Sequence, residues 1–347
     1  MFATDALSTS STARLATSAG YLAVHSAQDL RRAVGNARGL PLTFDASALD
    51  RVLHCDTTHG LVEVQSETTW RSLALRFSET APELAALASD AWLPERIGAS
   101  VARNAPGPDG RALVTHVESI ALVTPDAELR RVSRGLHPEL FRCAVGGHGA
   151  FGLIYSVTLR LDSLRRCART PSRDALLHLD TAGMLPTRRL DVHVSAERLD
   201  ELLTETRGLA TDWRIALVRI DVRRATCEEP TRLNPARADH AMVALRLQVP
   251  PGLGGIVRTK QFAREAIGLA LELGGGFGLE TGTDATREQA ERGYPALSSF
   301  LAEKLRYDPL DRLQTHCYRH YRDLLRRPHH EARGTAEPAA LAQAVGS

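Results

Sequence analysis

The chain has 347 residues, enough for two domains with their own cores, and 43 Lys and Arg against 41 Asp and Glu give a formal net charge of +2. This balance, with only 5% aromatic residues, excludes the basic and aromatic surface of a nucleic-acid-binding protein. No apolar run reaches the ~18 residues that a membrane-spanning helix needs, so no transmembrane segment is expected.

Patterning in the first half predicts alternating helices and strands after a disordered leader rich in Ser, Thr and Ala (residues 1–20). Ser26 is the expected cap of the first helix, and Pro125 with Asp126 forms the turn of a clear hairpin. The expected elements are a helix over 26–38, a strand over 41–44, paired strands over 48–53 and 61–66, a helix over 69–79, a hairpin over 118–133, a short helix over 137–144 and a strand over 153–161.

The second half predicts another sheet with helices, followed by a disordered tail (326–347). The expected elements are strands at 190–194, 213–224 and 240–250, helices near 196–208 and 255–273, a turn into a strand over 274–280, and two short helices within 286–309 broken at Pro295. The fold class is therefore α+β, with one domain over 21–165 and a second over 166–325.

The five cysteines are odd in number, widely spaced and without a C-x-x-C pair, so neither a zinc site nor a disulfide framework is expected. A reducing, cytoplasmic compartment fits this usage best. His329 and His330 lie in the tail, where they would bind a metal only adventitiously.

A glycine run, "VGGHGAFGLI" (145–154), contains Gly147-x-Gly149-x-x-Gly152, which matches the dinucleotide-binding fingerprint. That fingerprint requires a helix after its last glycine, whereas "LIYSVTLRL" (153–161) alternates apolar and polar residues like a strand. A nicotinamide-binding Rossmann fold is therefore disfavoured. Two alternatives remain: a tight turn before a strand, or a loop lying against a planar cofactor.

Several segments together resemble the FAD-linked oxidases of the vanillyl-alcohol oxidase type. They are "VEVQSETTWRSLALRF" (62–77), "IGASVARNAPGPDG" (97–110), "HVESIALVTPDAELRRVS" (116–133), "HPELFRCAVGGHGAFGLIYSVTLRL" (137–161) and "YPALSSFLAEKLRYDPLDRLQTHCYRHY" (294–321). The resemblance covers roughly 21–325. It implies a PCMH-type FAD-binding domain of two subdomains, followed by an α+β substrate (cap) domain with an antiparallel sheet.

The resemblance also implies a cofactor, a chemistry and a set of site residues. The enzyme would transfer hydride from an alcohol, sugar or lactone carbon to FAD and pass the electrons to an acceptor that the sequence does not identify. The residues expected at the flavin or the rest of the cofactor are Gly98, Ser100, Asn104, Gly107, Gly146, Gly147, Gly149, Gly152 and Ile154. The polar residues nominated for catalysis are Lys304, His316, Tyr318 and His320, where a histidine would serve as the base.

The resemblance ends at the glycine-rich phosphate loop. The common sequence of that loop in the family is R-G-x-G-x-S-x-G. Here "GLPLTF" (39–44) runs directly into "DASALDRV" (45–52), and family glycines are replaced by Glu67 and Ala99. Losing three charge-assisted hydrogen bonds would weaken cofactor binding by ~5–9 kcal/mol. The alternatives are a non-catalytic homologue acting as a binding or scaffold protein, or a segment lost through a sequence error after Phe44.

Overall fold

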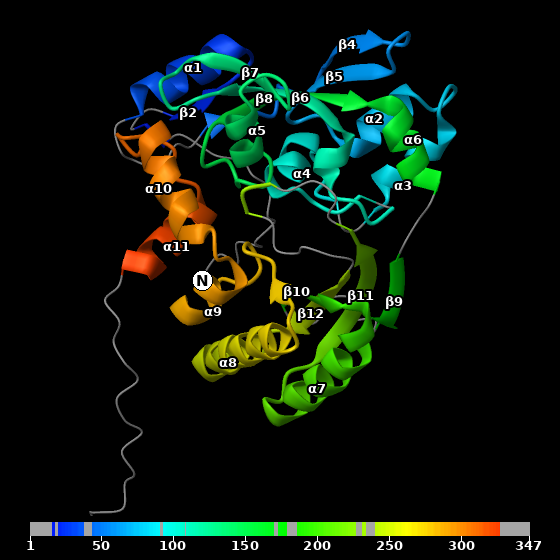
Figure 1. Ribbon diagram of the computed structural model, residues 1–347, viewed down its shortest axis with the longest axis vertical. Coiled ribbons are helices and arrows are strands. Elements are labelled where there is room, and N and C mark those ends of the chain that lie inside the picture. Colours follow the sequence, from blue (N-terminus) through cyan, green and yellow to red (C-terminus); the bar gives the residue numbers. More distant parts are fainter. Residues whose placement is uncertain are drawn as a thin grey trace, which may run out of the picture.

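The computed structural model describes residues 16–17, 20–37, 44–90, 93–107, 109–169, 173–178, 186–226, 231–233 and 240–326. These residues form a mixed α and β structure with two five-stranded antiparallel sheets, which confirms the α+β class (Figure 1). Nearly all of the expected leader and tail, and most of the expected strand at 41–44, lie outside the described residues.

The N-terminal part is a small three-stranded sheet with one helix. It contains β1 (Ala16–Thr17), β2 (Gly20–Ala23), α1 (Ala27–Asn36) and β3 (Phe44–Asp45), and β2 pairs in parallel with β3. Ser26 caps α1 as predicted, because its side chain accepts a hydrogen bond from the amide of Asp29. Leu30 and Val34 of α1 pack in a core that also takes Leu313 from the far end of the chain.

The first five-stranded sheet has the order β4-β5-β8-β6-β7, and every neighbouring pair is antiparallel. Both predicted pairings are present in it, but the strand expected over 48–53 runs over Val52–Asp56. Its strands are β4 (Val52–Asp56), β5 (Leu61–Gln65), β6 (Val117–Val123), β7 (Leu129–Ser133) and β8 (Leu153–Arg160). The helices around it are α2 (Trp70–Arg76), η1 (Pro82–Leu84), α3 (Ala85–Ala88), α4 (Ile97–Arg103), η2 (Leu113–His116), α5 (Pro138–Ala144) and α6 (Leu161–Arg169).

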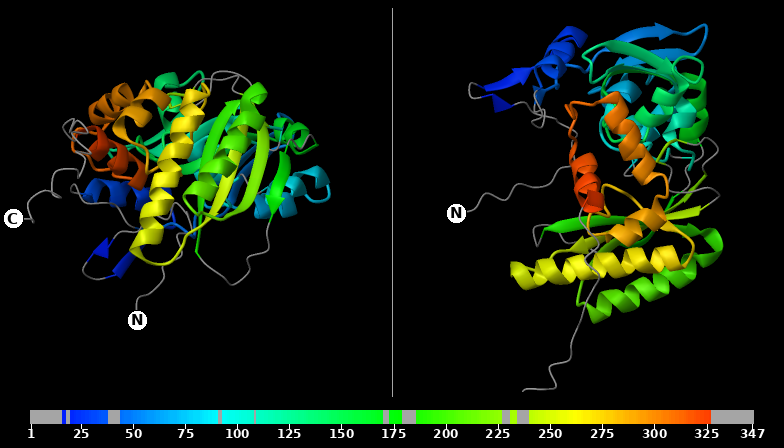
Figure 2. Two further views of the ribbon diagram at one scale, coloured as in Figure 1. Left: turned by 90° about the horizontal axis from the view of Figure 1, so that it is seen from below. Right: turned by 60° about the vertical axis from the view of Figure 1, so that its left-hand side comes forward.

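The second five-stranded sheet has the order β13-β10-β12-β11-β9. Its strands are β9 (Arg173–His178), β10 (Thr187–Ser195), β11 (Leu217–Ala225), β12 (His240–Gln248) and β13 (Gly276–Phe277). After η3 (Ala196–Arg198), helix α7 (Leu199–Asp212) and helix α8 (Gly252–Glu272) cover its outer face, while the first sheet lies on the opposite side (Figure 2).

The closing segment connects the two parts. It comprises α9 (Arg287–Gly293), α10 (Leu297–Tyr307) and α11 (His316–Arg326), and the predicted break at Pro295 separates the first two. Helix α9 contacts α8, while Phe300 and Tyr307 of α10 pack edge-to-face on Phe151 near the start of β8. The closing segment thus contacts both helix α8, which covers the second sheet, and the loop that leads into β8 of the first sheet.

Two observations bear on the organisation expected from sequence. Strand β8 directly follows Gly152. This rules out the hypothesis of a nicotinamide-binding Rossmann fold, because that fold needs a helix after the last glycine of the fingerprint. Helix α6 runs through position 165 and packs on η1, α3 and η2, so the chain leaves the first part only after this helix.

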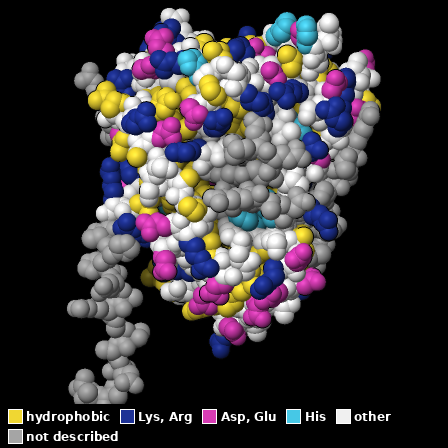
Figure 3. Space-filling model, in the orientation of Figure 1, with side chains coloured by type: hydrophobic (Ala, Val, Ile, Leu, Met, Phe, Trp, Pro, Cys, Tyr) yellow, Lys and Arg dark blue, Asp and Glu magenta, His cyan; other side chains and the backbone are white. Residues whose placement is uncertain are grey.

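The face shown in Figure 3 carries acidic and basic side chains interspersed with one another, rather than a field of one sign. Within the described residues, none of the helices combines the length and the apolar character needed to cross a bilayer.

Candidate functional site

The glycine loop (residues 145–152) connects α5 to β8, and its sequence is dictated by close packing. Gly146 and Gly149 adopt positive φ angles of 74° and 75°, which side chains disfavour. A Cβ on Gly147 would overlap the carbonyl oxygen of Cys143, and one on Gly152 would overlap the side chain of Leu122. The loop therefore needs glycine for its own packing, whatever else it contacts.

Two backbone hydrogen bonds attach this loop to helix α4. The amide of Gly146 donates to the carbonyl of Val101 at 3.1 Å, and the amide of His148 donates to that of Ala102 at 2.9 Å. Within the described part of the chain, the amides of Gly149, Phe151 and Gly152 donate to no backbone carbonyl. These three amides are the groups of the loop best able to serve a ligand.

An ionic cluster links the glycine loop to the second part of the molecule. Nδ1 of His148 lies 3.0 Å from Oε1 of Glu280, and Nε of Arg103 lies 2.6 Å from Oε2 of the same carboxylate. Burial alone would raise the pKa of Glu280, but the hydrogen bonds and charges of His148 and Arg103 outweigh it and lower that pKa. A negative charge is therefore fixed beside the loop.

Sequence reasoning missed this cluster, although His148 sits inside the glycine run. Glu280 is far away along the chain, and its loop is held by α11, where Tyr321 donates its hydroxyl to the carbonyl of Leu279 at 2.9 Å. The signal that could have drawn attention to His148 is its positive φ of 51°, which is unusual for a non-glycine residue. That signal is conformational and does not exist in the sequence.

The predicted cofactor residues Gly98 and Ser100 both lie in α4 and face the protein interior. The amide of Gly98 donates to the carbonyl of Ser66 at 2.8 Å. A Cβ atom added to Gly98 would lie 2.7 Å from the Cβ atom of Ser66. Ser100 is fully buried, and its hydroxyl accepts a hydrogen bond from Nε1 of Trp70 at 2.8 Å. Gly98 thus fastens α4 to the segment before α2, and Ser100 fastens it to α2 itself.

The predicted cofactor residues Asn104, Gly107 and Ile154 also make structural contacts. Asn104 ends α4 in the left-handed conformation, and its side-chain oxygen accepts from the amide of Val114 at 2.9 Å. A Cβ on Gly107 would lie 3.0 Å from Sγ of Cys167. Ile154 is half-buried in β8, opposite Leu122 of β6.

The four nominated catalytic residues fall into two pairs. Lys304 is fully buried, forms an ion pair with Asp308 and places Nζ 4.9 Å from the centre of the Tyr318 ring. The rings of His316 and His320 stack with their centres 6.5 Å apart on another face of α11. The structure therefore does not gather the four into one constellation.

The first pair is engaged in structural interactions. Burial lowers the pKa of Lys304 against the opposing pull of Asp308, whose carboxylate also accepts from the amides of Arg312 and Leu313. Burial raises the pKa of Tyr318 to about 12, and the carboxylate of Asp311 adds to the shift. This arrangement fixes the turn after α10.

A shallow groove of about 250 Å³ runs between α10 and α11, lined in part by Tyr318 and Arg322. It is smaller than the ~300–1,000 Å³ of typical small-molecule sites. The groove is therefore too small to hold a dinucleotide such as FAD.

Two acidic residues, Asp45 and Glu67, lie near each other at the end of β3, the point in the chain after which the resemblance would expect a phosphate loop. Strand β3 ends at Asp45, and Glu67 pairs with Nε of Arg96 at 2.5 Å. Burial raises the pKa of Glu67; Arg96 opposes this shift and Asp45 reinforces it. The amide of Ile97, which begins α4 beside this pair, donates to the carbonyl of Thr68 at 3.0 Å.

Replacing Gly147 by Ala is expected to lower the free energy of unfolding by about 1–3 kcal/mol, because the new methyl group would overlap the Cys143 carbonyl oxygen. Urea unfolding measures the change. The matched control is Gly208→Ala in α7, where open space surrounds the position and a gain of about 0.5–1 kcal/mol is expected. Equal stability of the two variants would contradict the packing described for the loop.

Alkaline pH is expected to destabilise the protein through Cys143, at the end of α5. Burial, followed by the charge of Glu303, raises the pKa of this thiol from 9.0 to about 12. Its stabilising contribution is therefore complete below pH 9.0 and is lost as the pH rises towards about 12. Urea unfolding of wild type and Cys143→Ala between about pH 8 and pH 10 should give a steeper fall for wild type, by up to about 1.4 kcal/mol per pH unit. Parallel pH profiles would contradict this.

The chain matches no protein-family model, and no curated protein matches its sequence.

Proposed function

We propose that the chain keeps the architecture of the FAD-linked oxidases, a PCMH-type two-subdomain domain with an α+β cap, and acts as a non-catalytic binding or scaffold protein with a closed phosphate site. The observation that carries this proposal is that the first two backbone amides of α4 are already hydrogen-bonded within the protein. Ile97 and Gly98 donate to Thr68 and Ser66 of the protein itself. In the resembled family this segment contacts the cofactor.

Electrostatics supports the same conclusion. A pyrophosphate carries negative charge and is held by amide groups and cations. Here the neighbouring side chains include those of Asp45 and Glu67, and the guanidinium of Arg96 beside Glu67 is already paired with it. Without the ~5–9 kcal/mol of three charge-assisted hydrogen bonds, affinity for FAD should fall by several powers of ten.

Two of the four nominated catalytic residues, Lys304 and Tyr318, support a non-catalytic role as well. A base must be within reach of the proton it removes. The ammonium of Lys304 is held by Asp308 in the interior, and Tyr318 lies against it. Both serve the packing of α10 against α11.

A visible absorption spectrum of the purified protein, supplemented with FAD and then desalted, tests the proposal. The expected result is a colourless protein, and the flavin should appear in the small-molecule fraction of the same column. A flavin spectrum near one per chain after desalting would overturn it.

The second candidate function is an FAD-dependent oxidoreductase acting on an alcohol, sugar or lactone carbon. The amides of Gly149 and Phe151, which donate to no backbone carbonyl of the described residues, favour it because the polar edge of a flavin needs such donors. If flavin is retained, anaerobic bleaching by a panel of alcohols and sugar lactones would identify the substrate class, and reoxidation by oxygen or a dye would identify the acceptor.

A reducing, cytoplasmic location accompanies both proposals. The four cysteines among the described residues, Cys55, Cys143, Cys167 and Cys317, are free thiols, which supports it.

A further inference from the structure

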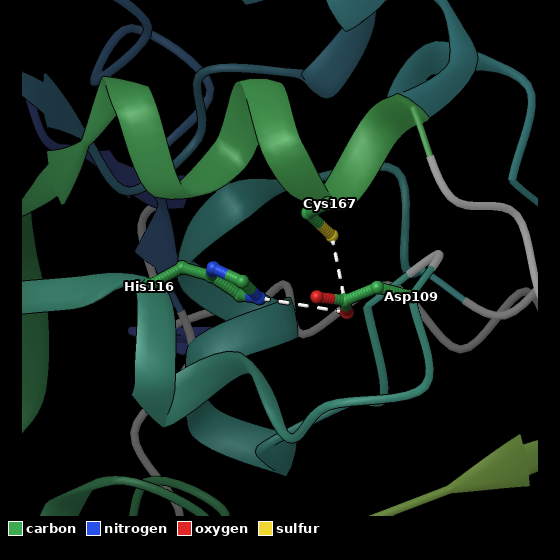
Figure 4. A group of neighbouring side chains, drawn as sticks. All are labelled: Asp109, His116 and Cys167. Atoms are coloured by element: carbon green, nitrogen blue, oxygen red, sulfur yellow. Dashed lines mark hydrogen bonds and ion pairs between the residues drawn. The ribbon is translucent and has the colours of Figure 1, made fainter.

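Three potential metal ligands from separate elements meet beneath the loop that follows α4. Asp109 lies in that loop, His116 ends η2 and Cys167 lies in α6. Figure 4 shows the carboxylate of Asp109 between the imidazole and the thiol, with both of those side chains directed towards it. The potential ligand atoms all lie within 4.8 Å of one another.

The cluster is buried, and one of its polar atoms lacks a partner. His116 is 1% exposed and Cys167 is 0% exposed. Within the described residues, Nε2 of His116 has no hydrogen-bond partner, and Oδ1 of Asp109 lies 3.7 Å from it, beyond hydrogen-bond distance. Buried polar atoms without partners are rare in folded proteins and ask for an explanation.

The other imidazole nitrogen is oriented as in metal-bound histidines. Nδ1 of His116 lies 2.7 Å from the hydroxyl oxygen of Ser163 in α6. If Nδ1 carries the proton and donates it to that oxygen, Nε2 presents a bare lone pair to Asp109 and Cys167. Such an outer hydrogen bond fixes the tautomer of a metal-ligating histidine.

Two of the three distances between the ligand atoms are close to those of a tetrahedral ion, and the third, from Nε2 of His116 to Sγ of Cys167, is within 4.8 Å. With Zn–S near 2.3 Å and Zn–O and Zn–N near 2.0–2.1 Å, tetrahedral angles place sulfur and oxygen about 3.5 Å apart and nitrogen and oxygen about 3.3 Å apart. The corresponding distances are 3.3 Å from Sγ of Cys167 to Oδ1 of Asp109 and 3.7 Å from that oxygen to Nε2 of His116. Side-chain shifts of a few tenths of an ångström would bring both to the ideal values.

We propose that Asp109, His116 and Cys167 form a zinc-binding site, with a water molecule as the fourth ligand. A thiolate with an imidazole selects zinc over magnesium or calcium, which prefer oxygen ligands. One thiolate and one carboxylate neutralise the two positive charges of the ion, so the buried complex carries no net charge.

The neighbouring cations leave room for the ion. Nε of Arg111 is 3.9 Å from Oδ2 of Asp109, but its side chain is half exposed and can turn towards solvent. The guanidinium of Arg223 is directed to Asp90 and to the carbonyls of Pro106 and Gly107. These hydrogen bonds of Arg223 are thus to groups other than the three ligand residues.

The expected role of the ion is structural. The cluster is buried, and the Asp109 side chain is only 14% exposed, so a substrate would have little access to the ion. Zinc would join the loop that carries Asp109 to α6, which the chain reaches only after β6, β7 and β8. The wide sequence separation of the ligands explains why their spacing did not indicate a zinc site.

Cobalt titration of the untagged full chain, first stripped of metal with a chelator, tests the proposal. Wild type should develop the visible bands of tetrahedral Co²⁺ and a thiolate-to-cobalt charge-transfer band, saturating at one ion per chain, and zinc should displace the cobalt. Cys167→Ala should abolish the charge-transfer band and weaken zinc binding by at least about 100-fold, more than the loss of an outer-shell partner costs.

Two further variants separate this site from other thiols and histidines. The triple variant Cys55→Ala/His329→Ala/His330→Ala removes the exposed thiol and the tail histidines, and it should bind as wild type does. Ser163→Ala should weaken binding by about 10-fold or more. A wild-type titration without the charge-transfer band, which needs no variant to fold, would overturn the proposal. So would zinc affinity unchanged in a Cys167→Ala protein whose circular dichroism matches wild type.

Discussion

Replacing Arg223 by Met is expected to lower the free energy of unfolding by about 3–5 kcal/mol. The Arg223 side chain, on β11 of the second sheet, is 0% exposed and donates to both oxygens of Asp90 at 2.5 and 2.6 Å. Its other nitrogen donates to the carbonyls of Pro106 and Gly107 at 2.9 and 2.8 Å. The methionine would leave a buried carboxylate and two carbonyls without this partner.

Urea unfolding followed by circular dichroism measures the effect, and Arg219→Met is its matched control. Arg219 lies on the same strand and pairs with Asp221, but its side chain is 32% exposed, so a loss of at most about 1 kcal/mol is expected. Equal losses for the two variants would show that Arg223 does not hold the second sheet to the first part of the molecule.

Replacing Lys304 by Met is expected to lower the free energy of unfolding by about 3–5 kcal/mol, because it removes one partner of a buried ion pair. Among the described residues, the change would leave the carboxylate of Asp308, 1% exposed, with the amides of Arg312 and Leu313 as its donors. The cation lying over the Tyr318 ring would also be lost.

The control for this substitution is Lys260→Met on α8, whose side chain is exposed, and a change within about 0.5 kcal/mol is expected there. Urea unfolding of both variants without added cofactor measures the difference. A Lys304→Met protein as stable as wild type would contradict the structural role and restore Lys304 as a candidate for chemistry.

Local signals in the sequence predicted much of the fold. The Ser26 cap, the turn at Pro125 and the break at Pro295 each act within a few residues, and each lies where the pattern put it. Helices α4 and α11 were missed for different reasons. α4 was interpreted as a glycine segment, and its helical form depends on the burial of its apolar side chains. In α11 the buried residues alternate with charged and polar ones, so no clear apolar pattern marks the helix.

The candidate sites were harder to predict because distant parts of the chain form them. Glu280 reaches His148 only because the closing segment positions its loop, and Cys167 reaches Asp109 only through the packing of α6. The glycines at Gly147 and its neighbours indicated a close approach of the backbone, because only glycine lacks the Cβ that would prevent it. The sequence could not show that the nearest approach is to the protein's own Cys143.

Calorimetric titration of the purified chain with FAD, and in parallel with riboflavin, tests the proposed closure of the phosphate site most directly. The two ligands share the flavin ring and differ in the phosphates and adenosine. If the phosphate site is closed, FAD should bind no more than about tenfold tighter than riboflavin, a difference below 1.4 kcal/mol, or neither ligand should bind. Submicromolar binding of FAD, more than about 100-fold tighter than that of riboflavin, would show a working pyrophosphate site and contradict the account.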